Sequence, residues 1–449
     1  MTTATRRGVE LLVAVAASLL VVLVSMPFAL QSAVLLVALA CWIRVTIGEL
    51  RAPTLAAGFV AAVVFVALAV CVIGPPRTSR DVWSYSMYGR IAVEHHDDPY
   101  VAVPSDFPDD PFLGRIGPRW RSTPPVYGPV FLVVAEGISR IARDSPLVSR
   151  VLFQIVAAGS AGMALLLMLR RSRAPGPLVL FGVGPVLLVS TVNGAHVDAW
   201  MLPLILGAFI AAERRHWARA GFALAIAALI KITVLVVVLG ACVWLLFEGA
   251  RRAAIVLGGV AGATVGAGYL VTSRHAFSGL SANASLLSRA SVWALPRWIV
   301  STFTSAHLDA PLAKLASASV VLVTVWACAY LIRRPGVRTA SSVPAAMLTG
   351  AVMLVVLGAY VLPWYAAPTL LLAAGVADDR WVPLVIVQSS CVFAAYLVAP
   401  SPFGRLHSPH PFKWFELLMA ATVLATAVWT FRKWWLDGAL REAALASSA

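Results

Sequence analysis

Long runs of apolar residues follow one another along nearly the whole chain, with short polar stretches between them. A helix of about 20 apolar residues crosses the hydrocarbon core of a bilayer, because only a helix pairs all of its backbone amides internally. The pattern therefore predicts an all-α polytopic membrane protein with about 12–14 transmembrane helices. We place these spans near 9–26, 29–46, 54–74, 147–169, 176–192, 197–213, 218–231, 232–247, 253–272, 311–333, 341–361, 364–376, 380–399 and 413–431.

One long polar interval, residues 75–127, interrupts this pattern after the third predicted span. It holds seven of the chain's 20 acidic residues. A second polar interval, residues 273–310, follows the ninth predicted span. Neither interval has the length or pattern of a soluble domain, and no internal repeat is evident. We therefore expect residues 1–449 to form a single integral membrane domain with two long loops.

Composition excludes a soluble globular protein. Apolar residues make up 60% of the chain and charged residues 12%, and the mean hydropathy is +0.86. A soluble protein carries about 25% charged residues. The net charge of +15 comes mostly from short clusters between apolar runs, which is typical of cytoplasmic loops. Membrane lipid is therefore an expected partner and nucleic acid is not.

The basic clusters also predict an orientation. They lie at residues 6–7, 44–51, 170–173, 214–215, 251–252, 333–334 and 432–433. All of them are cytoplasmic if the spans alternate as placed above. The intervals 75–127 and 273–310, with the short segments 193–198, 362–365 and 400–413, then lie outside. We expect a multi-pass protein of the plasma membrane.

Three smaller features complete this outline. Residues 128–143 are apolar enough to enter the membrane, but a full crossing would invert every later loop. We therefore predict a surface or membrane-dipping helix there. The charged and then apolar start of the chain predicts an uncleaved signal anchor, because a second span follows at once. The five cysteines all lie inside predicted spans without CxxC spacing, so neither a disulfide framework nor a zinc site is indicated.

Candidate chemistry begins at Asp81, just after the third predicted span. If the following residues are helical, Asp81, Tyr85 and Tyr88 share one face at positions i, i+4 and i+7. A carboxylate beside aromatic hydroxyls suits a general base that deprotonates a sugar hydroxyl. The alternative is an aspartate that satisfies free amides at a helix start.

Further polar groups in the long loop have weaker signals. Asp98 precedes Pro99 and Tyr100, and an Asp-Pro pair usually marks a turn. His95 and His96 stand beside acidic residues, but adjacent side chains on a helix point in different directions. Metal binding there remains an alternative.

Ionisable residues also occur within or beside the spans. Asn193, His196 and Asp198 lie between two spans, and at that depth they indicate a polar cavity or a helix cap. Lys231 lies inside an apolar run and needs an anionic partner, either a lipid phosphate or an internal carboxylate. Arg297 lies among tryptophans in the second loop, an arrangement that fits a phosphate site or an interfacial belt.

Several of these residues form short motifs in a familiar order. The motifs are Asp81-Val82-Trp83-Ser84-Tyr85 with Gly89-Arg90, Asp98-Pro99-Tyr100, Tyr127-Gly128-Pro129, Asn193-Gly194-x-His196-x-Asp198, the run that ends at Lys231, and Pro363-Trp364-Tyr365. From Asp81 to Tyr365 the chain resembles the GT-C superfamily of membrane glycosyltransferases. It is most similar to the actinobacterial polyprenol-phosphate-mannose-dependent α-(1→6)-mannosyltransferases of lipomannan assembly.

The resemblance implies an inverting sugar transfer from a polyprenyl-phosphate donor to a glycolipid or glycan acceptor of the envelope. It makes Asp81 the general base. It also suggests substrate contacts for Tyr85, Tyr88, Arg90, Asp98, Tyr100, Tyr127, Asn193, His196, Asp198, Lys231, Arg297, Trp364 and Tyr365. It implies no cofactor, since relatives with monophosphate donors do not need a metal, although the sequence leaves a divalent metal open.

The sequence therefore predicts a mannosyltransferase whose active site faces outside the cytoplasm. Three alternatives stay open at this point. A polyprenol-phosphate-arabinose-dependent enzyme would share the same motifs. A membrane transporter would need inverted repeats and charges at mid-membrane. A noncatalytic envelope assembly protein would not need Asp81.

Overall fold

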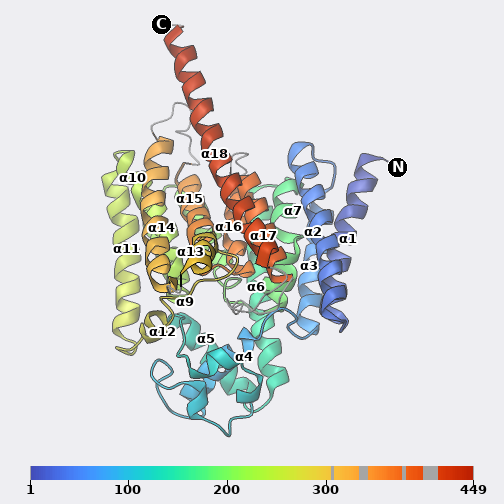
Figure 1. The fold of residues 1–449 in the computed structure, drawn as a ribbon, viewed down its shortest axis with the longest axis vertical. Coiled ribbons are helices and arrows are strands. Elements are labelled where there is room, and N and C mark those ends of the chain that lie inside the picture. The colour runs from blue at the N-terminus through green and yellow to red at the C-terminus, as the bar shows by residue number, and fades with distance from the viewer. Residues whose placement is uncertain (1, 305–307, 333–341, 377–380, 398–412, 448–449) are drawn as a thin grey trace. The chain divides into compact units, whose positions relative to one another are not determined.

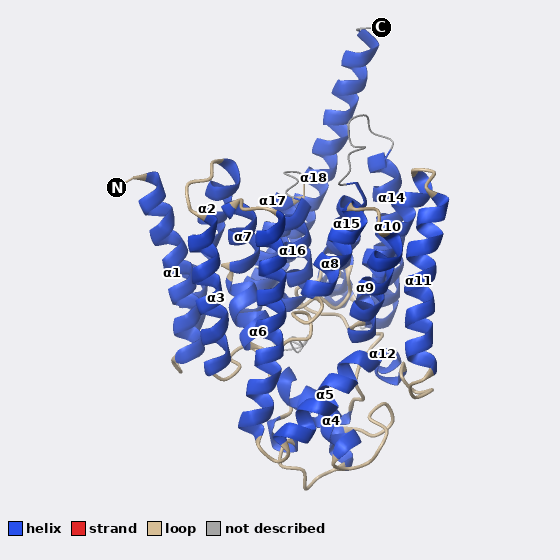
Figure 2. Cartoon of the chain, turned by 180° about the vertical axis from the view of Figure 1, so that it is seen from behind, coloured by secondary structure: helices blue, strands red, loops and turns tan. Residues whose placement is uncertain are grey.

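The computed structural model describes residues 2–304, 308–332, 342–376, 381–397 and 413–447. Within these ranges every regular element is a helix (Figure 2). By length and hydropathy, five described helices can each cross a membrane unaided, and a bent pair makes a sixth candidate span. Other predicted spans correspond to apolar helices of 10–17 residues. The predicted class, an all-α polytopic membrane protein, is confirmed.

The chain divides into two compact units. The first comprises Met1–Gly207, Phe222–Val234 and Ala261–Ala284, and the second comprises Ala208–Gly221, Leu235–Val260 and Ser285–Ala449. Three of the five boundaries fall inside helices α8 (Leu202–Glu213), α9 (Trp217–Ile230) and α11 (Arg251–Leu270). The expectation of a single domain stays a prediction.

Apolar helices form the body of the first unit. Helices α1 (Thr3–Leu23), α2 (Phe28–Arg51) and α3 (Ala57–Ile73) lie side by side, and α6 (Pro146–Arg171) packs against α3 (Figure 1). The predicted span 176–192 is broken. Helix α7 (Pro175–Gly182) and the π-helix η4 (Val186–Asn193) meet at an angle of 48°.

The long polar interval folds into short helices at one end of this unit. Helices α4 (Asp81–Val93) and α5 (Pro129–Ala142) lie beyond the ends of α1, α2 and α3 (Figure 2). The 3-10 helices η1 (Pro104–Asp106), η2 (Leu113–Arg115) and η3 (Pro118–Ser122) lie between them in the chain. Helices α4 and α5 touch at Gly89, where a Cβ atom would lie 2.4 Å from the Ala135 carbonyl oxygen. Helix α5 therefore packs against α4, and its place at the membrane surface stays a prediction.

One predicted boundary is wrong. The span expected to start at residue 197 begins at Leu202, because residues 194–201 form turns. Ala195 has a φ of +56°, which no helix tolerates, and the His196 amide bonds to the Thr191 carbonyl at 2.9 Å. The candidate residues His196 and Asp198 therefore lie on an irregular connector and not in a helix.

The second unit is also a helical bundle. Its elements include α10 (Leu235–Phe247), α13 (Ala294–Phe303), α14 (Asp309–Ile332), α15 (Ser342–Leu357), η6 (Pro363–Tyr365), α16 (Ala366–Val376), α17 (Val382–Leu397) and α18 (Lys413–Ser447). Helices α10, α14 and α15 pack against one another, and α17 packs against α18. Most of the predicted external segment 400–413 and the basic pair Arg333 and Arg334 lie outside the described residues.

Candidate active site

The Asp81 carboxylate lies at the first residue of α4. Its Oδ2 atom is 3.6 Å from Nδ1 of His196, and its side chain is 22% exposed. The Asp81 amide donates to the Ser79 hydroxyl at 3.0 Å, which fixes the entry to the helix. Burial raises the pKa of the Asp81 carboxyl to about 6, and this outweighs the opposing effects of Ser79 and Lys231. A carboxylate with this pKa is ionised at neutral pH and still takes up a proton readily.

Two tyrosines extend this contact. The Tyr85 hydroxyl lies 3.2 Å from His196 Nδ1, and the Tyr127 hydroxyl donates to the Tyr85 hydroxyl at 3.3 Å. The Tyr85 ring meets the Tyr127 ring edge-on at 5.2 Å and the Phe131 ring at 5.5 Å. Burial raises the pKa of Tyr85 well above its usual value, so the phenol stays neutral. Tyr85, Tyr127 and Phe131 thus form an aromatic wall beside His196.

A buried ion pair lies near this wall. Lys231 follows the end of α9, and its Nζ atom lies 2.9 and 3.0 Å from the two carboxylate oxygens of Asp198. Both side chains are almost fully buried. Of the two partners considered for Lys231, the structure supplies the internal carboxylate. Both charges act on Asp81, since Lys231 lowers its pKa and Asp198 raises it.

Asn193 is bound to the end of α3. Its Nδ2 atom donates to the carbonyls of Cys71 and Gly74 at 3.1 Å each, and its Oδ1 atom accepts from the Arg77 amide at 3.1 Å. Asn193 therefore joins the connector that carries His196 to the chain that leads to Asp81.

Three loop residues bind backbone or loop partners. Tyr88 donates to the Thr123 carbonyl and Tyr100 to the Tyr127 carbonyl, each at 3.1 Å. Asp98 accepts from the Tyr100 amide at 2.9 Å, as expected of a turn, and also from the Ser273 hydroxyl. The Asp98 contact joins the two polar loops within the first unit.

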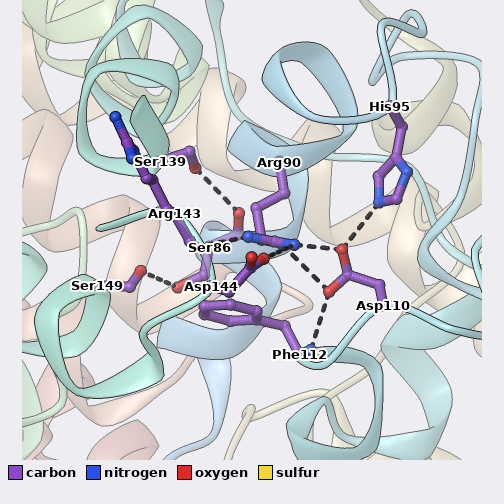
Figure 3. Close-up of polar contacts among 9 residues, drawn as sticks. All are labelled: Ser86, Arg90, His95, Asp110, Phe112, Ser139, Arg143, Asp144 and Ser149. Carbon is purple, nitrogen blue, oxygen red and sulfur yellow. Dashed lines mark hydrogen bonds and ion pairs between the residues drawn. The ribbon is translucent and has the colours of Figure 1, made fainter. Parts of the chain in front are cut away.

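Arg90 lies apart from Asp81, near the opposite end of α4. Its guanidinium binds the buried Asp110 carboxylate at 2.9 Å, the Arg143 carbonyl at 2.6 Å and the exposed Asp144 carboxylate at 2.9 Å (Figure 3). His95, one of the histidines considered for a metal, binds the same Asp110 carboxylate at 2.8 Å (Figure 3). These contacts fasten the end of α4 to the loop and to the α5–α6 turn.

The other three candidates belong to the second unit. Arg297 of α13 pairs with Asp309 at 3.3 Å. Trp364 and Tyr365 lie in η6, and the Tyr365 ring meets the Tyr360 ring at 6.3 Å. Their predicted contacts with substrate stay predictions.

Two polar residues of α6 were missed by the sequence analysis. Arg150 and Gln154 are buried, and both bind carbonyl groups at the end of α3. The available signal was their spacing, i and i+4, near the start of an otherwise apolar span. No three potential metal ligands come together in the described part of the chain. The expectation that no metal is needed stays a prediction.

Fold and geometry together define a class: a multi-pass helical membrane protein with a partly exposed carboxylate beside a buried histidine in its first unit. The chain belongs to the MptA/B family of α-(1→6)-mannopyranosyltransferases, because the model of that family's N-terminal domain matches residues 3–248. The family resemblance seen in the sequence is thereby confirmed.

Individual relatives match more modestly. The chain is 33% identical to a probable α-(1→6)-mannopyranosyltransferase of Mycolicibacterium smegmatis over 30% of its length. It is 24% identical to α-(1→6)-mannopyranosyltransferase A of Corynebacterium glutamicum over 39% of its length. These matches cover 25% and 36% of the two relatives. No solved structure matches the chain.

Proposed function

We propose that this protein is an inverting glycosyltransferase. It moves mannose from a polyprenyl-phosphate donor to a glycolipid or lipoglycan acceptor of the envelope, on the extracytoplasmic face. The observation that carries the proposal is the Asp81 carboxylate, which lies 3.6 Å from His196 and is still partly exposed. Family membership supports mannose as the transferred sugar.

In the proposed step, Asp81 takes the proton of the acceptor hydroxyl. The acceptor oxygen forms a bond to the anomeric carbon as the bond from that carbon to the phosphate oxygen breaks. Polyprenyl phosphate leaves with the electron pair. The negative charge on the leaving phosphate grows during this step, so a nearby cation would stabilise the transition state.

The neighbours of Asp81 fit supporting roles. The half-buried Tyr127 offers its ring to a sugar, and the buried Tyr85 hydroxyl supports it by accepting the Tyr127 hydrogen bond. Lys231 lowers the pKa of Asp81 and is held by the Asp198 carboxylate at 2.9 Å, so we assign it to the donor phosphate. Arg297 of the second unit is the other candidate for the donor phosphate.

The first test is the transfer reaction itself. Purified protein receives radiolabelled polyprenyl phosphate mannose and a lipomannan-type acceptor, beside an Asp81→Asn variant. We expect the variant to be slower by about 10²- to 10⁴-fold, because the amide cannot accept the proton. Unchanged transfer by a folded variant would exclude Asp81 as the base.

A parallel reaction with polyprenyl phosphate arabinose tests the choice of sugar. We expect transfer from the mannose donor alone. Transfer from the arabinose donor alone would replace the mannosyl assignment, and transfer from neither donor would contradict the enzymatic proposal.

A further inference from the structure

We propose that Gln154 positions Asp81 relative to His196, because its amide ties together the two chain segments that carry these residues. The inference rests on the proposed function, since it assigns Gln154 to the placement of the proposed base. Gln154 acts through the backbone of these segments, so it is a positioning residue.

Every polar atom of the Gln154 amide is used. The Nε2 atom donates to the Gly74 carbonyl at 3.0 Å and to the Asn193 carbonyl at 2.7 Å. The Oε1 atom accepts from Arg150 at 2.9 Å. The Gln154 side chain is fully buried. A single side chain thus joins the end of α3 to the end of η4.

These two points lead directly to the candidate site. The chain runs from Gly74 through a short loop to Asp81, and from Asn193 through the first turn of the connector to His196. Neither segment contains a helix that would hold its direction. The anchors of these two segments therefore help to set the separation of Asp81 and His196, together with the contacts that hold α4.

Other groups also hold the Gly74 end of this connection in place. Arg150 also donates to the Gly74 carbonyl, at 2.7 Å, and Asn193 does so at 3.1 Å. At Gly74 a Cβ atom would lie 2.3 Å from the Val22 carbonyl oxygen, so the chain passes very close to α1. A glycine at this position allows the approach. The Asn193 carbonyl accepts from the Gln154 amide at 2.7 Å.

The test replaces Gln154 by Met, which keeps the length of the side chain and removes its hydrogen bonds. We expect kcat to fall by about 10- to 100-fold, because small displacements of catalytic groups cost this much. The KM for the lipid donor should stay within about threefold, since the change affects the chemical step. The substrates are the mannose donor and the acceptor described above, and kcat is counted per folded molecule.

The second unit offers a matched control. Gln388 in α17 is equally buried, and its Nε2 atom donates to the Val355 carbonyl at 3.1 Å. We expect Gln388→Met to lower thermal stability and to leave kcat per folded molecule unchanged. A purely structural role for Gln154 would give the same result in both variants.

The outcomes separate the two proposals. An inactive wild-type protein contradicts the proposed function. An active wild type with undiminished kcat in Gln154→Met contradicts the positioning role alone. If the Met variant does not fold, Gln154→Asn replaces it. The shorter amide cannot reach both carbonyls, so kcat should still fall, and an unchanged kcat would overturn the inference.

Discussion

At the scale of single residues, the charge of Asp81 controls the proposed reaction. Its pKa is raised to about 6 by burial, so the carboxylate is ionised above this pH and protonated below it. Only the ionised form accepts a proton. We expect kcat/KM for mannose transfer to be level near pH 7 and to fall about tenfold per pH unit below about 6. A pH–rate profile with the mannose donor measures this.

The titratable and charged groups around Asp81 determine which ionisation the pH–rate profile measures. They are Tyr85 and Tyr88 on α4, Tyr127 before α5, His196 and Asp198 on the connector, and Lys231 after α9. Burial raises the pKa of both α4 tyrosines, which therefore do not titrate near pH 6. An acid limb with its midpoint near 4 would show that Asp81 titrates like an ordinary solvent-exposed carboxyl.

Sequence reasoning identified residues whose signal is local. Asp81 and Tyr85 are four positions apart, and the helix that this spacing needs begins at Asp81. The partner of Lys231 was left open, because residues far apart in the chain meet only through the tertiary fold. Gln154 was missed for a related reason. The spacing of Arg150 and Gln154 marks a polar face on the span but gives no sign of the carbonyls that the two side chains will bind.

At the scale of elements, α4 is held near both ends. Asp81 lies beside His196 at its start, and Arg90 is bound near its end. In between, the Ser86 hydroxyl lies 2.7 Å from the Ser149 hydroxyl of α6 (Figure 3). A helix fastened to α5, α6 and the loop gives the base a rigid support. This arrangement could not be predicted from the sequence, which gives Arg90 no distinguishing neighbour.

The two carboxylates of the Arg90 network should contribute very differently to stability. Asp110 is fully buried, whereas the Asp144 side chain is 79% exposed. Removing Asp110 leaves a buried guanidinium without its main counter-charge, which costs about 3–5 kcal/mol. Removing Asp144 costs at most about 1 kcal/mol, because water screens an exposed pair. We expect Asp110→Ala to lower the thermal unfolding midpoint clearly and Asp144→Ala to leave it nearly unchanged.

Both variants are measured in the same detergent, with the wild type beside them. Equal shifts for the two would mean that Arg90 is not anchored through the buried carboxylate. His95 also belongs to this network. Its ring binds Asp110 and stacks on Phe107 at 4.0 Å.

Element boundaries followed the hydropathy pattern where helices are regular. The predicted spans 54–74 and 147–169 correspond to α3 and α6 within a few residues. The prediction failed at residues 197–201, which are apolar enough for a helix but form turns. An apolar composition indicates that a segment is buried, but it does not distinguish a buried helix from a buried connector.

At the scale of the whole molecule, the proposal depends on which side of the membrane carries the first long loop. The charge pattern predicts the outside. This prediction depends on helix α5, because a membrane crossing by α5 would move every later loop to the opposite side. It has 14 residues and is about 21 Å long, whereas the hydrocarbon core is about 30 Å thick. Because α9, a predicted span, has the same length, the charge pattern and not length carries the expectation that α5 stays at the surface. Helix α6 is long and apolar enough to cross the membrane after the loop.

Cysteine labelling tests this orientation directly. Ser105 lies exposed in the first loop, and Ser172 lies exposed just after α6. In intact cells, a membrane-impermeant maleimide should label Ser105→Cys. It should label Ser172→Cys only after the membrane is opened. The unmodified chain is the control, since its five cysteines are buried or partly buried. If both positions react in intact cells, α5 crosses the membrane. If only Ser172→Cys reacts, the loop with Asp81 faces the cytoplasm, where the proposed transfer cannot take place.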